Sequence, residues 1–246
     1  STAAALVTAA AGVPVAKHGN RSVTSRSGAS DVLAALGVNI TAGVAQVEAC
    51  LSELGICFCF APLHHRAMKH VAAARAKLGT PTIFNILGPL CNPAAAPRQL
   101  LGVGTAQLRP LLAEAVAMLG TRRTVVVHGT DGLDEVSLGA TTEVTEVAGN
   151  RLTELRWTPD DFGLKPSGPE PLRVEGPEQS AQRIREIFAG RPGPPRDIVV
   201  ANTAAALWTA GRGETLIQCA AAAAEAIDSG AAEALLKRLA ERSWAK

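Results

Sequence analysis

Apolar and amphipathic segments alternate along most of the chain. Short apolar runs predict strands at 13–16, 56–60, 99–103 and 124–128. Apolar residues spaced three or four apart predict helices at about 30–36, 44–54, 66–78 and 107–119. Ser1 and Thr2 are suited to cap a further, alanine-rich helix that ends at Gly12. Strands separated by helices predict an α/β fold with a mostly parallel central sheet flanked by helices.

The second half of the chain has a different pattern. Residues 141–157 alternate between apolar and polar and turn at Gly149-Asn150, which predicts an antiparallel hairpin. Segments 163–177 and 191–195 are rich in proline and glycine and predict loops, and the rest of the C-terminal third predicts helices. Because no internal repeat or long linker interrupts the pattern, residues 1–246 are interpreted as one large α/β domain.

The segment after the first predicted strand carries the strongest chemical signal. Residues 17–31 form a polar loop that leads into the N-terminus of a predicted helix, where backbone N–H groups and the helix dipole favour anions. Lys17, Arg21 and Arg26 add positive charge to this loop. Short hydrogen-bonding side chains accompany them, namely Asn20, Ser22, Thr24, Ser25 and Ser27. The loop predicts phosphate or pyrophosphate binding, although an ordinary solvated turn has a similar composition.

Two adjacent carboxylates, Asp134 and Glu135, follow the buried strand at 124–128. Ligands bind at the carboxyl ends of strands in a parallel α/β sheet. Mg²⁺ prefers one or two carboxylates together with water and substrate phosphates. An acidic pair alone also fits a solvated turn, but together with a phosphate loop it predicts a Mg²⁺ site for a pyrophosphate substrate.

Composition argues against several other classes of protein. The formal net charge of +2 and the 3% of aromatic residues disfavour a nucleic-acid binder, and no apolar run is long enough to predict a membrane span. The five cysteines include no Cys-x-x-Cys pair, so neither a zinc ribbon nor a thioredoxin-type site is indicated, and their odd number suits a reducing cytoplasm. Within the strand predicted at 56–60, Cys57 and Cys59 are expected to point to the same face.

Three weaker motifs are interpreted without assigning them a site. Gly102-Val103-Gly104-Thr105 lacks the third glycine and the later acid of a dinucleotide-binding loop. His64, His65 and His70 have no acidic or cysteine partner at metal-ligand spacing and are interpreted as surface or substrate-pocket histidines. The sequence contains no Gly-x-Ser-x-Gly motif, so a hydrolase triad is not indicated.

Two of these motifs together resemble one family. The order Lys-His-Gly-Asn-Arg, a Ser/Thr run and Ser-Gly-x-x-Asp, followed later by Asp-Gly-Leu-Asp-Glu, closely resembles the anthranilate phosphoribosyltransferases. Segments 58–70, 82–93 and 226–232 are also similar, so the resemblance covers essentially the whole chain. It implies the class III phosphoribosyltransferase fold, which resembles that of nucleoside phosphorylases.

The resemblance also implies a reaction. In it, 5-phosphoribose passes from phosphoribosyl pyrophosphate to anthranilate during tryptophan biosynthesis, giving N-(5-phosphoribosyl)anthranilate and pyrophosphate. No covalent catalytic residue is implied, because alignment of the substrates and stabilisation of the departing charge suffice. The implied cofactor is Mg²⁺, and no nucleic-acid or membrane partner is expected.

Individual residues receive roles from the same resemblance. Asn20 and Arg75 are expected to bind anthranilate, Arg75 through the carboxylate. Ser1, Asp134 and Glu135 are expected to hold Mg²⁺. The expected contacts of phosphoribosyl pyrophosphate are Ser1, Thr2, Lys17, His18, Gly19, Asn20, Arg21, Ser22, Val23, Thr24, Ser25 and Ala29.

Segments that this sequence lacks are implied as well. Family members carry a Gly-Thr-Gly-Gly-Asp phosphate loop and a small helical domain ahead of the position of Ser1, and residues 64–80 are expected to pack with that domain. Without these parts we expect weak binding of phosphoribosyl pyrophosphate, an exposed apolar patch, and a monomeric or aggregation-prone chain. A complete family member is expected to be a cytoplasmic homodimer.

Other functions stay open at this point. A pyrimidine nucleoside phosphorylase shares the loop type but does not need the Asp134-Glu135 pair, so Mg²⁺-independent phosphorolysis of thymidine would reveal it. An inactive relative, or one that binds nucleic acid, is a further alternative. The near-neutral charge disfavours nucleic-acid binding. A measurement of salt-sensitive DNA binding would support this alternative again.

Overall fold

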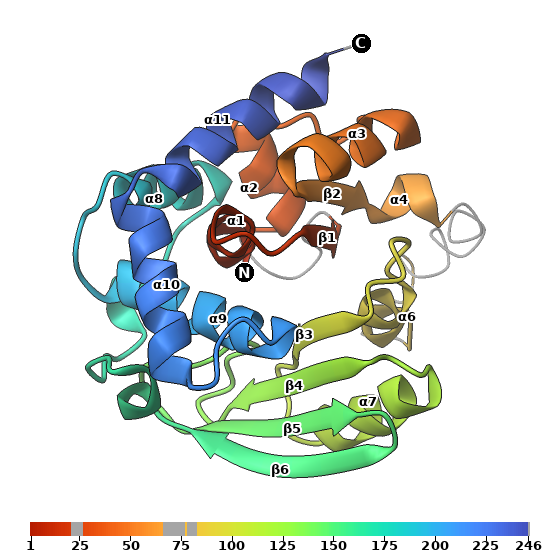
Figure 1. The fold of residues 1–246 in the computed structure, drawn as a ribbon, viewed down its shortest axis with the longest axis vertical. Helices are drawn as coiled ribbons and strands as arrows, with labels where there is room; N and C mark the ends of the chain where they lie inside the picture. The colour runs from red at the N-terminus through yellow and green to blue at the C-terminus, as the bar shows by residue number, and fades with distance from the viewer. Residues whose placement is uncertain (21–26, 66–76, 78–82, 246) are drawn as a thin grey trace.

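The computed structural model describes residues 1–20, 27–65, 77 and 83–245, and its described strands form two sheets (Figure 1). The first sheet pairs β1 (Val15–Gly19) with β2 (Ile56–Phe60) in parallel. The second has the order β3-β4-β5-β6, built from β3 (Arg98–Gly102), β4 (Arg123–Gly129), β5 (Thr142–Ala148) and β6 (Arg151–Trp157). In this sheet β3 and β4 are parallel, whereas β5 and β6 are antiparallel to their neighbours. The predicted α/β class and the predicted hairpin at 141–157 are confirmed.

Helices surround and separate the two sheets. The α-helices are α1 (Thr2–Ala10), α2 (Ala29–Ala35), α3 (Val44–Leu54), α4 (Ala61–His64), α6 (Ile83–Leu87), α7 (Leu108–Met118), α8 (Pro177–Phe188), α9 (Pro194–Ala210), α10 (Leu216–Asp228) and α11 (Ala231–Trp244). Short 3₁₀ helices are η2 (Gly88–Cys91), η3 (Pro159–Phe162) and η4 (Glu170–Leu172). The helix predicted at 66–78 lies outside the described residues apart from residue 77. Among the helices described, none is long and apolar enough to cross a membrane.

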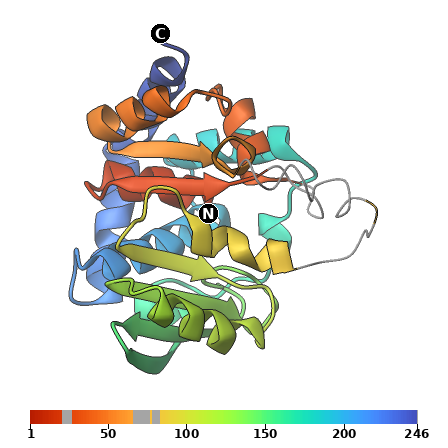
Figure 2. The same cartoon turned by 90° about the vertical axis from the view of Figure 1, so that its right-hand side faces the viewer.

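Strand β4 is buried on both faces, as its run of three consecutive valines predicts. Val125 and Val127 belong to the main core, which also contains α9 and the β1–β2 sheet. Val126 points to the opposite face and packs with Leu112 and Val116 of α7 in a smaller core. The two sheets therefore lie in separate layers, with α9 between them and α7 on the far face of the second sheet (Figures 1 and 2).

Helix α9 is the central support of the fold. It contacts α1, α10, β3 and β4, and its residues 199–205 are all buried. Alanines at 201, 204 and 205 have no exposed surface, which allows neighbouring backbones to approach closely. Two polar residues, Asn202 and Thr203, are buried in the same stretch. A helix of this composition places its few polar groups where they must find partners inside the protein.

The last turn of α11 closes over a much earlier part of the chain. Arg242 donates two hydrogen bonds of 2.8 Å to the Glu53 carboxylate of α3. The hydroxyl of Ser243 accepts from the backbone N–H of Asn39 at 2.8 Å, and the indole N–H of Trp244 donates to the Gly37 carbonyl at 3.0 Å. These contacts hold α11 across α2 and α3 (Figure 1).

One predicted boundary differs from the structure. The first strand was expected at 13–16, with a loop from Lys17 onward, but β1 runs from Val15 to Gly19. Its backbone continues in register beside β2, with Lys17 opposite Phe58. Strand pairing uses backbone groups, so it extends past the end of the apolar run. Lys17, His18 and Gly19 are therefore held on a strand.

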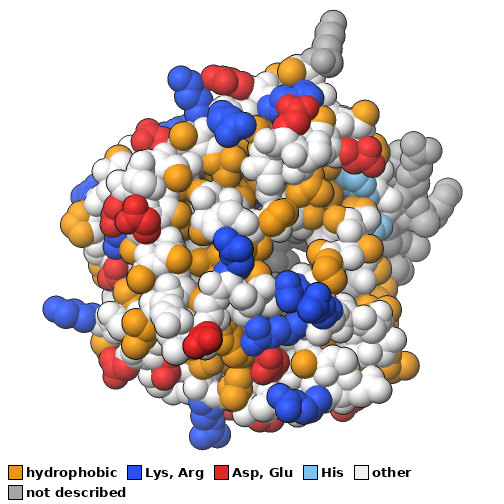
Figure 3. Space-filling view, in the orientation of Figure 1, with side chains coloured by type: hydrophobic (Ala, Val, Ile, Leu, Met, Phe, Trp, Pro, Cys, Tyr) orange, Lys and Arg blue, Asp and Glu red, His pale blue; other side chains and the backbone are white. Residues whose placement is uncertain are grey.

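On the face shown in Figure 3, acidic and basic side chains are interspersed among apolar ones. This distribution agrees with the near-neutral net charge of +2. Cys57 and Cys59 lie in the buried interior on one side of β2, with their sulfur atoms 4.0 Å apart. The expected shared face of these two thiols is confirmed.

Candidate active site

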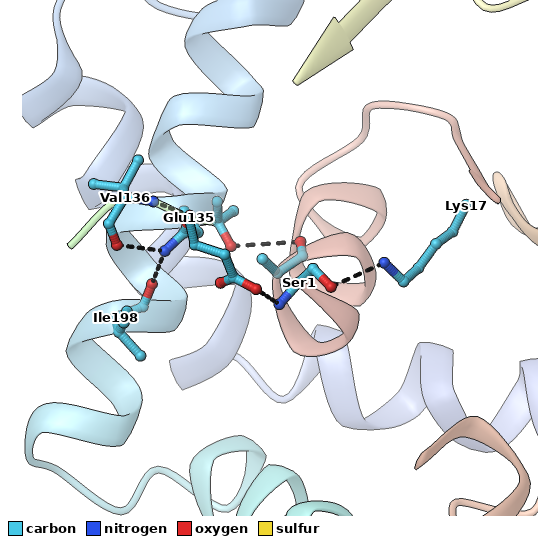
Figure 4. A network of polar contacts seen from close by, with 8 residues as sticks. Ser1, Lys17, Glu135, Val136 and Ile198 are labelled. Atoms are coloured by element: carbon cyan, nitrogen blue, oxygen red, sulfur yellow. Dashed lines mark hydrogen bonds and ion pairs between the residues drawn. The ribbon is translucent and has the colours of Figure 1, made fainter. Parts of the chain in front are cut away.

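Three segments that are distant in sequence meet at the N-terminus of α1 (Figure 4). Lys17 of β1 donates from its Nζ to the hydroxyl of Ser1 at 3.1 Å. The nitrogen of Ser1 donates to Oε1 of Glu135 at 2.6 Å. Ser1 thus lies between an ammonium group and a carboxylate. The phosphate-loop motif and the acidic motif, which sequence alone relates only by their order, contribute to one site.

The charges in this cluster influence one another. Burial lowers the pKa of Lys17, while the nearby carboxylates of Glu135 and Asp134 oppose that change. Burial raises the pKa of Glu135, and the positive charge of Lys17 opposes that change. Lys17 and Glu135 therefore each favour the charged form of the other.

Ser1 does not cap α1 with its side chain, contrary to expectation. It occupies the N-cap position, but its hydroxyl makes no capping hydrogen bond. That hydroxyl instead accepts from Lys17. Thr2, the first residue of α1, is buried. The tertiary contact with β1 thus replaces the local contact that the sequence pattern predicts.

A tight turn after β4 presents the two acids. Gly132 has a φ of +89°, in the left-handed region that favours glycine, and its N–H donates to the Gly129 carbonyl at 2.8 Å. Asp131 accepts from the Leu133 N–H at 3.3 Å, and its other oxygen accepts from the Ser137 hydroxyl at 2.6 Å. In the Asp-Gly-Leu-Asp-Glu motif, the first aspartate therefore stabilises the turn, and Asp134 and Glu135 are left for other partners.

Gly102 lets this acidic turn lie directly against β3. A Cβ at position 102 would overlap the carbonyl oxygen of Asp134 and lie 2.6 Å from its carbonyl carbon. Close backbone packing thus explains the first glycine of Gly102-Val103-Gly104. From the sequence, this motif was compared with a dinucleotide loop, and its connection to Asp134 was missed.

The donor set fits Mg²⁺ bound together with a phosphorylated substrate. Asp134 is exposed and Glu135 is partly buried, and both carboxylates act electrostatically on Lys17, whose amine contacts the Ser1 hydroxyl. Within the residues that the structure describes, no group of three or more His, Cys, Asp or Glu side chains is placed to hold a metal ion. The site suits an ion whose remaining ligands are water and substrate oxygens.

His18 joins the site to a second histidine. Its Nδ1 lies 3.1 Å from the Gly88 carbonyl, and its Nε2 lies 3.0 Å from Nε2 of His65. A carbonyl only accepts, so Nδ1 of His18 donates and Nε2 accepts from His65. Burial and the neighbouring His65 lower the pKa of His18. His65 thus supports a residue of the expected phosphate site.

Acid is expected to destabilise the protein through this pair. The pKa of His18 is lower in the folded state, so the unfolded state binds more protons as the pH falls below about 6.5. Stability present above that pH is therefore lost as the pH falls toward the folded pKa of His18. Melting temperatures between pH 8 and pH 5 would measure the loss, and His65→Leu should reduce its slope. An equal slope in the two proteins would contradict this origin.

Several expected site residues are placed and others are not. Gly19 ends β1 and Asn20 follows it, while Ala29 begins α2, where its Cβ is 3.6 Å from a Cβ built on Gly19. Carboxyl-terminal strand ends thus carry both halves of the site. The expected residues outside the described part of the chain are Arg21, Ser22, Val23, Thr24, Ser25 and Arg75.

Two features near the acids were not found from the sequence. Asn202 of α9 hydrogen-bonds to the backbone of Val136, and its only sequence signal is a lone amide in the apolar stretch 198–207. A pocket of about 320 Å³ adjoins the acidic turn and is lined by Asp131, Ser137, Arg173 and neighbouring residues. Asp134 and Glu135 do not line this pocket.

Comparison with known proteins gives a consistent result. Residues 1–233 match the glycosyl transferase family, a/b domain. The chain is 54% identical to an anthranilate phosphoribosyltransferase of Rhodospirillum rubrum, over 97% of this chain and 69% of that protein.

Comparison with solved structures indicates the same family. The crystal structure of anthranilate phosphoribosyltransferase from Thermus thermophilus superposes with a TM-score of 0.93 at 43% identity, covering 100% of this chain and 73% of that one. The Saccharomyces cerevisiae enzyme, in complex with PRPP and Mg, gives a TM-score of 0.91 at 31% identity, covering 99% of this chain and 69% of that one.

Proposed function

This chain belongs to the anthranilate phosphoribosyltransferase family, and we propose that it transfers 5-phosphoribose from phosphoribosyl pyrophosphate to anthranilate. The observation that carries the proposal is the meeting of Lys17, Ser1 and Glu135 at the N-terminus of α1. An ammonium group beside an acidic pair suits a substrate that is both phosphorylated and bound to Mg²⁺.

The chemistry requires alignment and charge stabilisation. The amine of anthranilate attacks C1 of the ribose, the bond from C1 to the pyrophosphate oxygen breaks, and the amine releases a proton. Lys17 donates to the departing phosphate oxygens, and the positive end of the α1 dipole faces the same charge. Asp134, Glu135 and the Ser1 hydroxyl would hold the metal. When bound, Mg²⁺ neutralises charge that develops on the pyrophosphate.

The remaining contacts extend from this centre. Phosphoribosyl pyrophosphate is held by Lys17, His18 and Gly19 on β1, by Asn20 and residues 21–25 of the following loop, and by Thr2 and Ala29. Anthranilate binds to Asn20 and Arg75. The position of Asn20 immediately after a parallel strand supports its role between the two substrates.

The wider organisation is also part of the proposal. Residues 1–246 form a large α/β domain that works with a small helical domain, and the complete protein is a cytoplasmic homodimer. Leu63 and Ile83, on either side of residues 66–82, are 42% and 64% exposed, which supports packing of a further domain against this region.

Anthranilate fluorescence tests the reaction. In the presence of phosphoribosyl pyrophosphate and Mg²⁺, the fluorescence is expected to fall, and EDTA is expected to stop the decrease because the acidic pair binds pyrophosphate through the metal. Excess Mg²⁺ added after EDTA should restore the decrease in fluorescence. A chain that instead cleaves thymidine with phosphate, without Mg²⁺, would be a nucleoside phosphorylase.

A further inference from the structure

Asn202 is a buried amide in the middle of α9. Its exposure is 4%, and the residues on either side of it, Ala201 and Thr203, have no exposed surface. Asparagine is a poor residue for a helix interior, and an amide taken out of water needs hydrogen-bond partners to offset the cost. The identity of this side chain therefore depends on what it binds.

The amide holds a single residue of the acidic turn by both of its backbone groups. Oδ1 accepts from the Val136 N–H at 2.8 Å, and Nδ2 donates to the Val136 carbonyl at 3.0 Å. Nδ2 also donates to the Ile198 carbonyl at 3.0 Å (Figure 4). Two opposed hydrogen bonds to one residue fix both its position and its rotation.

The adjacent residue on α9 reaches the other half of the site. The hydroxyl of Thr203 lies 3.4 Å from the carbonyl of Ala4, in the first turn of α1, which Ser1 precedes. Val136 directly follows Glu135. Two consecutive residues of α9 thus contact the residue after Glu135 and the first turn of the helix that Ser1 precedes.

We propose that Asn202 is a positioning residue that sets where the Glu135 carboxylate stands relative to Ser1 and Lys17, and thereby how tightly the site binds Mg²⁺-pyrophosphate. The inference rests on the proposed function, because pyrophosphate is the product released there. Partners that orient metal-binding carboxylates commonly change metal affinity or activity by about 10- to 100-fold when removed.

Asn202→Leu tests this role, because leucine is close in size and forms no hydrogen bond. Calorimetry with Mg²⁺ and inorganic pyrophosphate is expected to show binding weakened by about tenfold or more. The KM for anthranilate should stay within about twofold, since the proposed contacts of that substrate are Asn20 and Arg75. Amide exchange at Val136 in the metal-free protein should become faster.

Thr209→Val is the matched control. Thr209 is a buried polar residue of the same helix whose hydroxyl donates to the Ala205 carbonyl at 2.7 Å. This variant should lose stability while binding Mg²⁺-pyrophosphate as the wild type does. If Asn202→Leu does not fold, Asn202→Asp keeps the shape and the acceptor but loses both N–H donors, and should weaken binding in the same direction.

The outcomes separate this inference from the proposed function. A wild type that binds Mg²⁺-pyrophosphate but does not consume anthranilate would reject the function alone. Asn202 variants that melt earlier but bind Mg²⁺-pyrophosphate as tightly as the wild type would show a structural role only and overturn the inference. A wild type that does not bind Mg²⁺-pyrophosphate would also overturn the inference.

Discussion

The substitution Gly102→Ala is expected to reduce kcat by about 100-fold, since a displacement of about 1 Å at a reacting site can have this effect. The added methyl group would overlap the carbonyl oxygen of Asp134. The opposing atom is backbone, so it cannot move aside as a side-chain end could. The acidic turn must shift as a whole, taking both carboxylates away from Ser1 and Lys17.

Measurements on this variant should separate the turn from the rest of the fold. We expect a higher Mg²⁺ concentration for half-maximal activity and a loss of about 1–3 kcal/mol in the free energy of unfolding, as is typical of overpacking. Gly104→Ala is the control, because the nearest atom to its added Cβ is the Gly132 carbonyl oxygen at 4.0 Å. Equal losses in the two variants would mean that the contact with Asp134 is not the cause.

The substitution Glu135→Gln is expected to reduce kcat/KM for phosphoribosyl pyrophosphate by about 100-fold, equivalent to about 2.7 kcal/mol of transition-state stabilisation. Glutamine keeps the size of the side chain and an oxygen that can accept from the Ser1 nitrogen. The fold should therefore persist while the negative charge that attracts Mg²⁺ is lost.

Steady-state kinetics across a range of Mg²⁺ concentrations would measure this effect, with melting temperature as the check on folding. Glu225→Gln, at an exposed position on α10, is the control for loss of a carboxylate elsewhere. If Glu135→Gln retains the Mg²⁺ dependence of the wild type, the acidic pair does not hold the metal.

Elements with a clear local pattern could be predicted from the sequence. Three consecutive valines lie at 125–127, so the strand, and the position of the acids after it, could be predicted from neighbouring residues. The hairpin at 141–157 was found in the same way. These elements are determined by side-chain periodicity and turn residues within a short window.

Features that depend on distant contacts were less accessible. Strand β1 extends through Lys17 because β2 provides backbone partners, and Asn202 matters because Val136 lies beside it although 66 residues separate them. Gly102 is required by the backbone of Asp134, which no local pattern contains. The expected role of Arg75 stays a prediction, since that residue lies outside the described part of the chain.

The closure of α11 over α2 and α3 has a consequence for how the protein reaches its native state during synthesis. Arg242 and Glu53 are separated by 189 residues, so α11 is translated long after α3 leaves the ribosome. Contacts of such sequence separation form slowly, and nascent chains with uncovered apolar segments are prone to aggregation. The surface of α3 that α11 covers is therefore exposed until translation of α11 is complete.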